Sequence, residues 1–250
     1  MPPISAILFD AGNTLIYADP ERLADILRST GAVTDARRVA AAEMEARRGL
    51  HACIQDGCNG TEPEVWQDYF TDIFRLAGVP DEGMAEAGRL LWEVHSREHL
   101  WTHVAPGTEA TLVELRDAGY RLAVISNADG RMEGVLQEVG LRPHFEFVMD
   151  SEVVGMEKPD PEIFLEGARR LESEPRKCLY VGDLFPVDYL GATRAGLQAV
   201  LLDPLGLHDG RAPSVPDLNA LPAFLGGQAG APRDVVADSL DSRAHPRPAP

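Results

Sequence analysis

Short runs of apolar residues recur along the chain and are separated by longer stretches with helical spacing. The runs are too short for helices and fit buried strands; they cover 4–9, 121–126, 145–150, 178–181 and 197–202. Stretches with helical spacing lie between them, at 108–118, 131–139, 161–171 and 187–195. Strands that alternate with helices of about 10–15 residues form β-α-β units. The pattern therefore predicts an α/β fold with an open, doubly wound parallel sheet.

The stretch 17–103 interrupts this alternation, because its pattern predicts helices and no strand. Its expected helices begin near residues 20, 35, 61 and 81 and end near Gly31, Gly49, Gly78 and His95. Asp19 followed by Pro20 is typical of a helix start, and residues 61–64 read as a capping box. We therefore expect a core of residues 1–16 and 104–225 and an inserted helical cap at 17–103. Residues 226–250, rich in Gly, Ala and Pro, are expected to form a flexible tail.

The charge of the chain narrows its possible partners. Its 250 residues include 23 Lys and Arg against 40 Asp and Glu, a formal net charge of −17. So acidic a surface repels phosphate backbones and anionic lipid, which disfavours nucleic acid and membranes as partners. No apolar run reaches the roughly 18 residues of a membrane span, and no secretory signal precedes the first strand. A cytoplasmic monomer or homodimer is expected.

The cysteines support the same expectation. Cys53, Cys58 and Cys178 have neither the spacing of metal ligands nor that of a disulfide framework. We therefore expect free thiols, as in a reducing compartment.

Polar residues follow the predicted core strands, at the edge where open parallel sheets bind ligands. They are Asp10, Ser126, Asn127, Lys158, Asp183 and Asp188. Three carboxylates close together repel one another unless cations lie between them. Lys158 supplies one positive charge, and Mg²⁺, which prefers oxygen ligands, supplies two. Since an aspartate beside Mg²⁺ can act as a nucleophile towards phosphorus, the residues predict metal-assisted phosphoryl transfer.

Several stretches at these positions together carry a resemblance to a known family. They read ILFDAGNTL, VISNADG, GMEKPDPEIF and YVGDLFPVDYLGATRAG, in the family's order. With them the sequence resembles the haloacid dehalogenase-like hydrolases, and in particular the phosphatases with a helical cap. The resemblance implies a Rossmann-like core, a mobile cap and a Mg²⁺-dependent reaction through an aspartyl phosphate.

The resemblance also implies roles for individual residues. Asp10 would be the nucleophile, and Lys158 would pair with it and with the phosphate. The groups implied to bind the phosphoryl group are Thr14, Ser126 and the Asn127 backbone. The groups implied to hold Mg²⁺ are Asp10, the carbonyl of Gly12, Asp183 and Asp188, the last directly or through water.

Gly12 departs from the pattern, because most phosphatases of the superfamily carry a second aspartate there. That aspartate serves as the general acid and base, and help of this kind is typically worth about 10²–10⁴ in rate. The sequence therefore predicts a slow phosphatase of a small phosphorylated metabolite. Two alternatives stay open, a non-catalytic protein that keeps the phosphate pocket and a metal-free 2-haloacid dehalogenase. Asp183 and Asp188 favour the phosphatase.

Residues of the predicted cap suggest substrate contacts. Family resemblance places the segment 47–60 over the nucleophile, where His51 and Gln55 would select the substrate; an ordinary solvated connection is the alternative. A set of histidines at intervals of four could share one helix face, but no carboxylate or cysteine completes a metal site; they are His95, His99 and His103. The tryptophans are expected to be packing anchors, with stacking on a substrate as the alternative; they are Trp66, Trp92 and Trp101.

Overall fold

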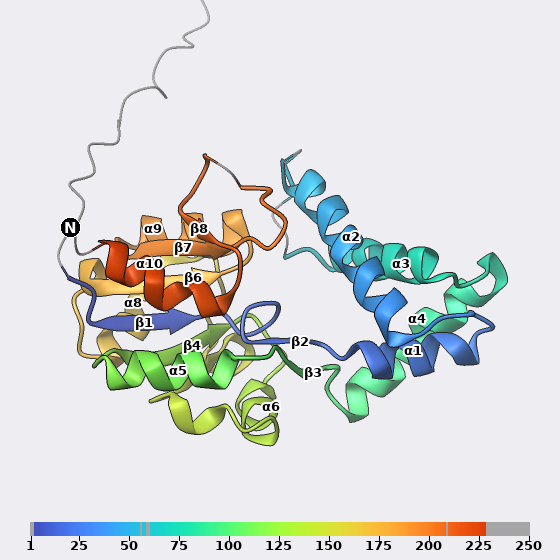
Figure 1. Ribbon diagram of the computed structural model, residues 1–250, viewed down its shortest axis with the longest axis horizontal. Helices are drawn as coiled ribbons and strands as arrows, with labels where there is room; N and C mark the ends of the chain where they lie inside the picture. Colours follow the sequence, from blue (N-terminus) through green and yellow to red (C-terminus); the bar gives the residue numbers. More distant parts are fainter. Residues whose placement is uncertain (1–2, 56, 59–60, 209, 229–250) are drawn as a thin grey trace, which may run out of the picture.

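The computed structural model describes residues 3–55, 57–58, 61–208 and 210–228 (Figure 1). Its centre is a six-stranded sheet in the order β5-β4-β1-β6-β7-β8, in which every neighbouring pair is parallel. The strands are β1 (Ala6–Phe9), β4 (Arg121–Ser126), β5 (Val148–Asp150), β6 (Cys178–Gly182), β7 (Gln198–Leu202) and β8 (Ser214–Val215). The predicted α/β class and doubly wound parallel sheet are confirmed. The edge strand β8 was not predicted, because two residues carry no readable pattern.

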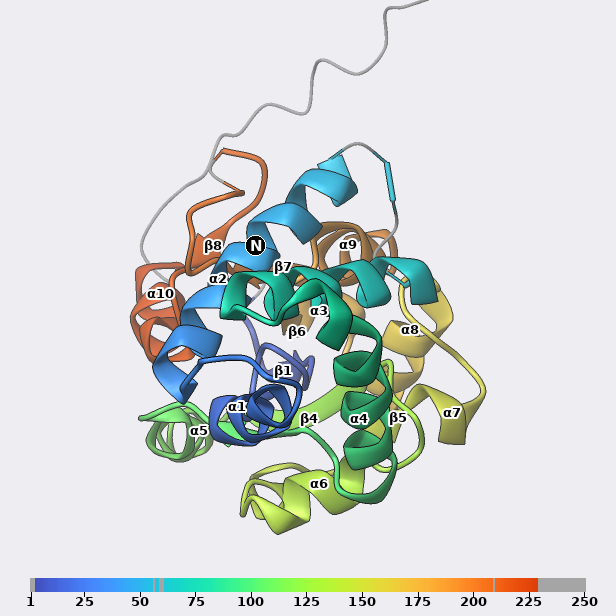
Figure 2. The ribbon, with the colours of Figure 1, turned by 90° about the vertical axis from the view of Figure 1, so that its right-hand side faces the viewer.

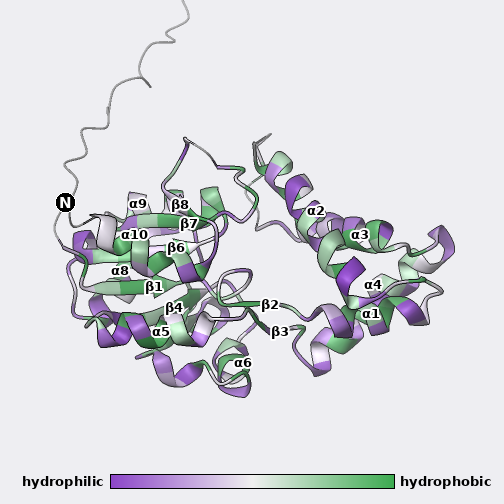
Figure 3. Ribbon diagram, in the orientation of Figure 1, coloured by the Kyte–Doolittle hydropathy of each residue, from purple (hydrophilic) through white to green (hydrophobic). Residues whose placement is uncertain are grey.

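Helices cover both faces of this sheet. They are α5 (Thr108–Asp117), α6 (Met132–Glu138), α7 (Ser151–Val154), α8 (Pro161–Arg170), α9 (Leu190–Arg194) and α10 (Leu221–Gln228). Side chains of β1 alternate between two apolar cores, since Ile7 and Phe9 pack with α5, α6 and α10, whereas Ala6 and Leu8 pack with α8 and α9. In Figure 3 the strands carry mostly hydrophobic colours, and the helices show both hydrophobic and hydrophilic colours. This two-sided burial explains why the strands read as continuous apolar runs.

Two boundaries of the core differ from the expectation. A five-residue π-helical turn, Phe185–Tyr189, precedes α9 in the stretch expected to be one helix. The tail was expected from residue 226, but α10 continues to Gln228 because Leu221 and Leu225 anchor it to the core. Residues 229–250 lie outside the described part of the chain.

Helices α1–α4 form a separate layer, seen in front of the sheet in Figure 2. They are α1 (Pro20–Ser29), α2 (Ala36–Gln55), α3 (Pro63–Ala77) and α4 (Met84–Arg97). They share an apolar core of their own, in which Leu27, Val39 and Ile73 are fully buried. No helix in the described residues is long and apolar enough to cross a membrane.

Local signals mispredicted parts of this layer. Gly49 was expected to end α2, but the helix continues to Gln55, because the φ of Gly49 lies outside the left-handed region that ends helices and Leu50 is buried in the apolar core of this layer. The capping box at 61–64 was wrong, since Glu62 is the N-cap of α3 and its side chain makes no capping hydrogen bond. Trp92, expected as a packing anchor, is 71% exposed because it lies on the outer face of α4.

A ribbon of two antiparallel strands joins the two layers. It consists of β2 (Ile16–Ala18) and β3 (Trp101–Val104), and it corrects the expectation of no strand within 17–103. The chain leaves the sheet through β2 and returns to it through β3 at the same place, so these two segments lie side by side and can pair. The ribbon also separates the histidines expected on one helix face. His95 lies in the last turn of α4, His99 follows the helix, and His103 lies in β3.

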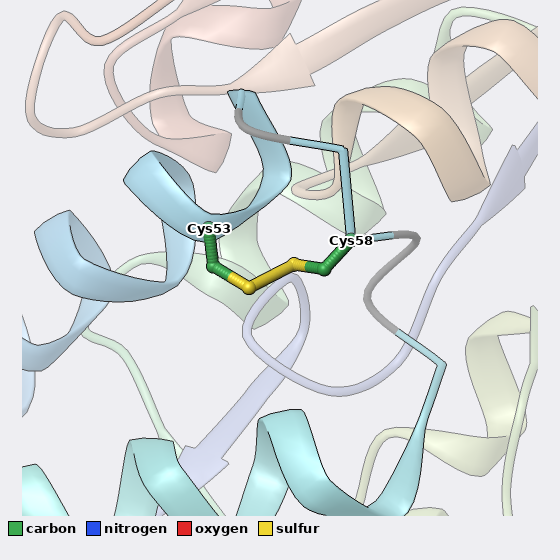
Figure 4. Close-up of a disulfide and its surroundings, with 2 residues drawn as sticks. All are labelled: Cys53 and Cys58. Carbon is green, nitrogen blue, oxygen red and sulfur yellow. A yellow bond between two sulfur atoms is a disulfide. The ribbon is translucent and has the colours of Figure 1, made fainter.

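The structure joins Cys53 and Cys58 in a disulfide, which contradicts the expectation of free thiols (Figure 4). The last turn of α2 ends at this point, and the Cys58 N–H donates to the Cys53 carbonyl at 3.1 Å, so the two Cα atoms lie 5.6 Å apart. Cys178 is a buried free cysteine, as expected. The disulfide removes cysteine usage as an argument for a reducing compartment.

Candidate functional site

The site lies at the carboxyl ends of β1, β4 and β6. Phe9 of β1 pairs with Val124 of β4 and with Val181 of β6, so the three strands end at nearly the same level. Residues that follow these strands therefore meet at one edge of the sheet. A cavity of about 450 Å³ opens there, and the predicted residues that line it are Asp10, Gly12, Ser126, Asn127, Lys158, Asp183 and Asp188.

Lys158 is the buried centre of this edge. Its Nζ lies 2.6 Å from Oδ1 of Asp10, 2.7 Å from Oδ1 of Asp188 and 2.9 Å from the hydroxyl of Tyr180. Burial disfavours the charged ammonium, but Asp10 and Asp188 outweigh burial and raise the Lys158 pKa well above its ordinary value. Sequence reasoning missed Tyr180, because its place in an apolar strand reads only as core.

Hydrogen bonds fix the groups on either side of the lysine. Asn127 Nδ2 donates to the Lys158 carbonyl at 2.8 Å, and the Lys158 N–H donates to Asn127 Oδ1 at 2.8 Å. The Asn127 side chain thus holds the lysine loop, a role that the sequence did not indicate. Thr14, expected to bind phosphate, does not line the cavity; its hydroxyl donates to Asp10 Oδ2 at 3.3 Å. Ser126 lines the cavity at the end of β4.

The carboxylates of Asp10, Asp183 and Asp188 gather around one point. Each offers one oxygen, and these oxygens lie within 4.8 Å of one another. Burial raises the pKa of Asp10 to about 6, with Lys158 opposing the rise. Burial, together with the charges of Asp10 and Asp188, raises the pKa of Asp183 to about 8. Three acidic groups share one ammonium, so the set carries excess negative charge, and its oxygen donors suit Mg²⁺.

Asp188 also organises the loop after β6. Its Oδ2 accepts hydrogen bonds from the backbone N–H groups of Asp183 and Leu184, at 3.0 and 2.9 Å, while Oδ1 faces Lys158. A Cβ on Gly182 would lie 2.4 Å from Asp188 Cγ, so only glycine permits this close approach. Both carboxylate oxygens are therefore engaged before any metal binds.

The opposite wall of the cavity is aromatic and comes from the helical layer and the ribbon. Its side chains are Trp66, His95, His99 and Trp101. Asp129, from the loop after β4, supplies the carboxylate that the histidines lacked in the sequence, and ligand atoms of His95, His99 and Asp129 lie within 4.8 Å of one another. However, Arg131 already occupies this group. Its guanidinium lies 2.5 Å from Asp129 Oδ2 and 3.2 Å from His95 Nε2.

Gly12 lines the cavity between these two walls. Its φ lies outside the left-handed region, so the backbone there does not require glycine. A Cβ built on Gly12 would meet only Trp101, at 3.6 Å from Nε1 and 3.7 Å from Cδ1. These are ordinary contact distances, so a Cβ at residue 12 would fit without a clash.

His51, one of the two predicted specificity residues, lies outside this cavity. His51 packs against His208, with ring centroids 4.5 Å apart, in a separate hollow of about 50 Å³ that Arg47 and Asp183 also line. The structure does not bring His51 into the cavity that contains Asp10. The Gln55 side chain lies outside the described part of the chain. The charge of Arg47, in α2, also reaches the site, because it lowers the pKa of Asp183 against the effect of burial.

Comparisons with known proteins find similar sequences and structures. The family model for haloacid dehalogenase-like hydrolases matches residues 4–196. The chain is 41% identical over 170 residues to haloacid dehalogenase-like hydrolase domain-containing protein 3 of Mus musculus, and this match spans 66% of each protein. It is 32% identical over 207 residues to a glyceraldehyde 3-phosphate phosphatase of Methanopyrus kandleri, which covers 79% of this chain and 83% of that protein.

Among solved structures, the chain resembles a HAD phosphatase from Thermococcus onnurineus. The TM-score is 0.58 at 26% sequence identity, and the match covers 90% of this chain and 99% of that chain.

Proposed function

Because the chain belongs to the haloacid dehalogenase-like hydrolase family, we propose that it is a Mg²⁺-dependent phosphatase of a small phosphate monoester. The observation that carries this proposal is the buried pairing of Asp10 with Lys158 beside Asp183, where burial and the neighbouring carboxylates raise the pKa of Asp183 to about 8 although Arg47 and Lys158 oppose the rise. The two relatives named as phosphatases, from Methanopyrus kandleri and Thermococcus onnurineus, support the same reaction. The acidic surface disfavours nucleic acid, so a small phosphorylated metabolite is the proposed substrate.

In this proposal Asp10 attacks phosphorus in line with the leaving group. Thr14 and Lys158 each bind one of its carboxylate oxygens, which fixes the orientation of the carboxylate before attack. Lys158 then offsets negative charge on the transferring group, while Ser126 and the Asn127 N–H donate to its oxygens. Water then attacks the phosphorus of the aspartyl phosphate and passes its proton to an oxygen of the phosphate, while the bond to Asp10 breaks and its electron pair returns to the carboxylate.

The same residues fit Mg²⁺. Asp10, Asp183 and the Gly12 carbonyl would hold the ion, with Asp188 directly or through water. When bound, the ion offsets the excess charge of the carboxylates and polarises the phosphoryl oxygens. Since Lys158 and two N–H groups engage both oxygens of Asp188, that residue also serves to position the lysine and the loop after β6.

Purified protein assayed with 4-nitrophenyl phosphate tests this function. We expect turnover that needs Mg²⁺ and stops with EDTA, and no chloride release from 2-chloropropionate. Metal-independent chloride release would instead establish the dehalogenase. Gly12 favours one alternative, a silent phosphate-binding protein. Such a protein would bind phosphate or a beryllium fluoride mimic with neither a burst nor turnover.

A further inference from the structure

The indole of Trp101 occupies the space beside Gly12. Trp101 begins β3 in the ribbon that joins the two layers, and it lines the same cavity as Asp10 and Gly12. Its Nε1 lies 3.6 Å from the position that a Cβ of residue 12 would take. Among the residues that the structure describes, no acceptor takes a hydrogen bond from this N–H. The Trp101 indole N–H is therefore an unused hydrogen-bond donor beside the position that an acidic side chain at residue 12 would occupy.

We propose that the Trp101 indole N–H replaces that side chain by donating a hydrogen bond to the oxygen of the leaving group. The inference rests on the proposed phosphatase function. In the first step a bond forms between Asp10 and phosphorus, and the bond from phosphorus to the leaving oxygen breaks. The electron pair of the broken bond stays on the leaving oxygen. The indole keeps its proton, and the released anion takes a proton from water.

This arrangement restricts the class of substrate. A hydrogen bond stabilises the departing oxyanion but does not neutralise it. The site therefore suits leaving groups that carry negative charge well, such as phenols, enols and carboxylates, over simple alcohols. The rings of Trp66, His99 and Trp101 on the same wall give a planar, aromatic leaving group surfaces to pack against.

The neighbouring histidines are poor sources of a proton. The backbone N–H of Trp101 donates to His99 Nδ1 at 3.3 Å, and that of Leu100 donates to His95 Nδ1 at 3.4 Å. Protonation of either ring would place a hydrogen on Nδ1 and break its bond. Arg131 adds a positive charge 3.2 Å from His95 Nε2. Burial, followed by the charge of His95, lowers the pKa of His99 to about 4, so its ring is neutral at pH 7.

Trp101→Phe tests the proposal, because it keeps an aromatic ring and removes the N–H. We would measure kcat/KM at saturating Mg²⁺ for 4-nitrophenyl, phenyl and alkyl phosphates. We expect a loss of about 10²–10³ for alkyl phosphates, the scale of one oxyanion donor, and a loss below about threefold for 4-nitrophenyl phosphate. Trp92→Phe is the matched control, since Trp92 is 71% exposed and does not line this cavity; its rates should follow the parent across the series.

Equal losses across the series would show that Trp101 only packs, and an unchanged series would show that it contributes nothing; either result overturns the proposal. Absence of turnover in the parent protein would instead contradict the phosphatase function. A second measurement does not depend on how Trp101→Phe folds. In Asp10→Asn, which should bind substrate without turnover, the indole ¹⁵N–¹H signal of Trp101 should move downfield with phenyl phosphate. A signal that stays in place at saturation overturns the proposal.

Discussion

Two groups of metal-ligand type face each other across one cavity, and they differ in charge. The core cluster is Asp10, Asp183 and Asp188, and the cap cluster is His95, His99 and Asp129. In both, the ligand atoms lie within 4.8 Å of one another. By spacing and residue type alone, the cap cluster is as good a candidate for a metal as the core cluster.

Charge balance separates the two. In the cap cluster, Arg131 binds Asp129 and contacts His95. The negative charge of the one carboxylate in this cluster is therefore already balanced by a positive charge. In the core cluster, Lys158 pairs with Asp10 and Asp188, and the pKa of Asp183 still rises to about 8 through burial and its acidic neighbours, although Arg47 and Lys158 oppose the rise. Excess buried charge, more than ligand spacing, therefore indicates where a cation is needed.

The largest expected effect comes from removing the proposed nucleophile of the core cluster. Asp10→Asn keeps the shape of the side chain but loses the attacking oxygen, so kcat should fall by at least about 10³. Steady-state assays with 4-nitrophenyl phosphate measure the loss, and circular dichroism should show an unchanged fold. Activity within tenfold of the parent would remove Asp10 from the mechanism.

The next effect separates the clusters by their need for Mg²⁺. Asp183→Asn removes a carboxylate from the core cluster, so the Mg²⁺ concentration for half-maximal activity should rise at least about tenfold. Asp129→Asn is the matched change in the cap cluster and should leave that midpoint unchanged. Superimposed titration curves for the parent and Asp183→Asn would show that Asp183 is not a ligand.

The raised pKa of Asp183 gives a pH dependence with a defined sign. Between about 4 and 8, the folded metal-free chain holds a proton that the unfolded chain, with a value near 3.8, has lost. The free energy of unfolding should therefore fall as pH rises through this window and level off above about 8. Because Mg²⁺ must displace that proton, its affinity should rise about tenfold per pH unit below 8.

Thermal melts in EDTA and with Mg²⁺, at several pH values from 5 to 9, measure both trends. Asp183→Asn should lose this part of the pH dependence. If the stability of the parent and that of Asp183→Asn change with pH in the same way, Asp183 is ionised throughout the range.

The smallest expected effect concerns the cation already present in the cap cluster. Arg131→Met removes the guanidinium that faces Asp129 and His95, so Zn²⁺ should bind that cluster more tightly, by about fivefold. Calorimetry in an Asp183→Asn background keeps the core cluster from dominating the signal. His99→Gln added to Arg131→Met should abolish the gain. A gain that survives this change would place the zinc elsewhere.

The positions of the catalytic candidates along the chain could be predicted because they follow from local burial. In the run 121–126 the four central residues are all apolar, since both faces of a parallel strand are covered, and the run coincides with β4 of the sheet. Parallel strands end at one edge, so residues just beyond them, such as Asp10 and Asp183, were expected together before any contact was known. The structure places both on one cavity.

Other features depended on where distant segments of the chain meet. The Tyr180 hydroxyl beside Lys158, the carboxylate of Asp129 beside His95, and Trp101 beside Gly12 join residues 22, 34 and 89 positions apart. No local pattern encodes such pairs. The extension of α2 past Gly49 likewise goes with the burial of Leu50 in the apolar core that α2 shares with α3. The sequence by itself determined which positions are buried and which polar groups follow the strands, because burial leaves a periodic pattern. Only the tertiary structure decided which of those groups are already paired, because pairing depends on the path that brings remote side chains together.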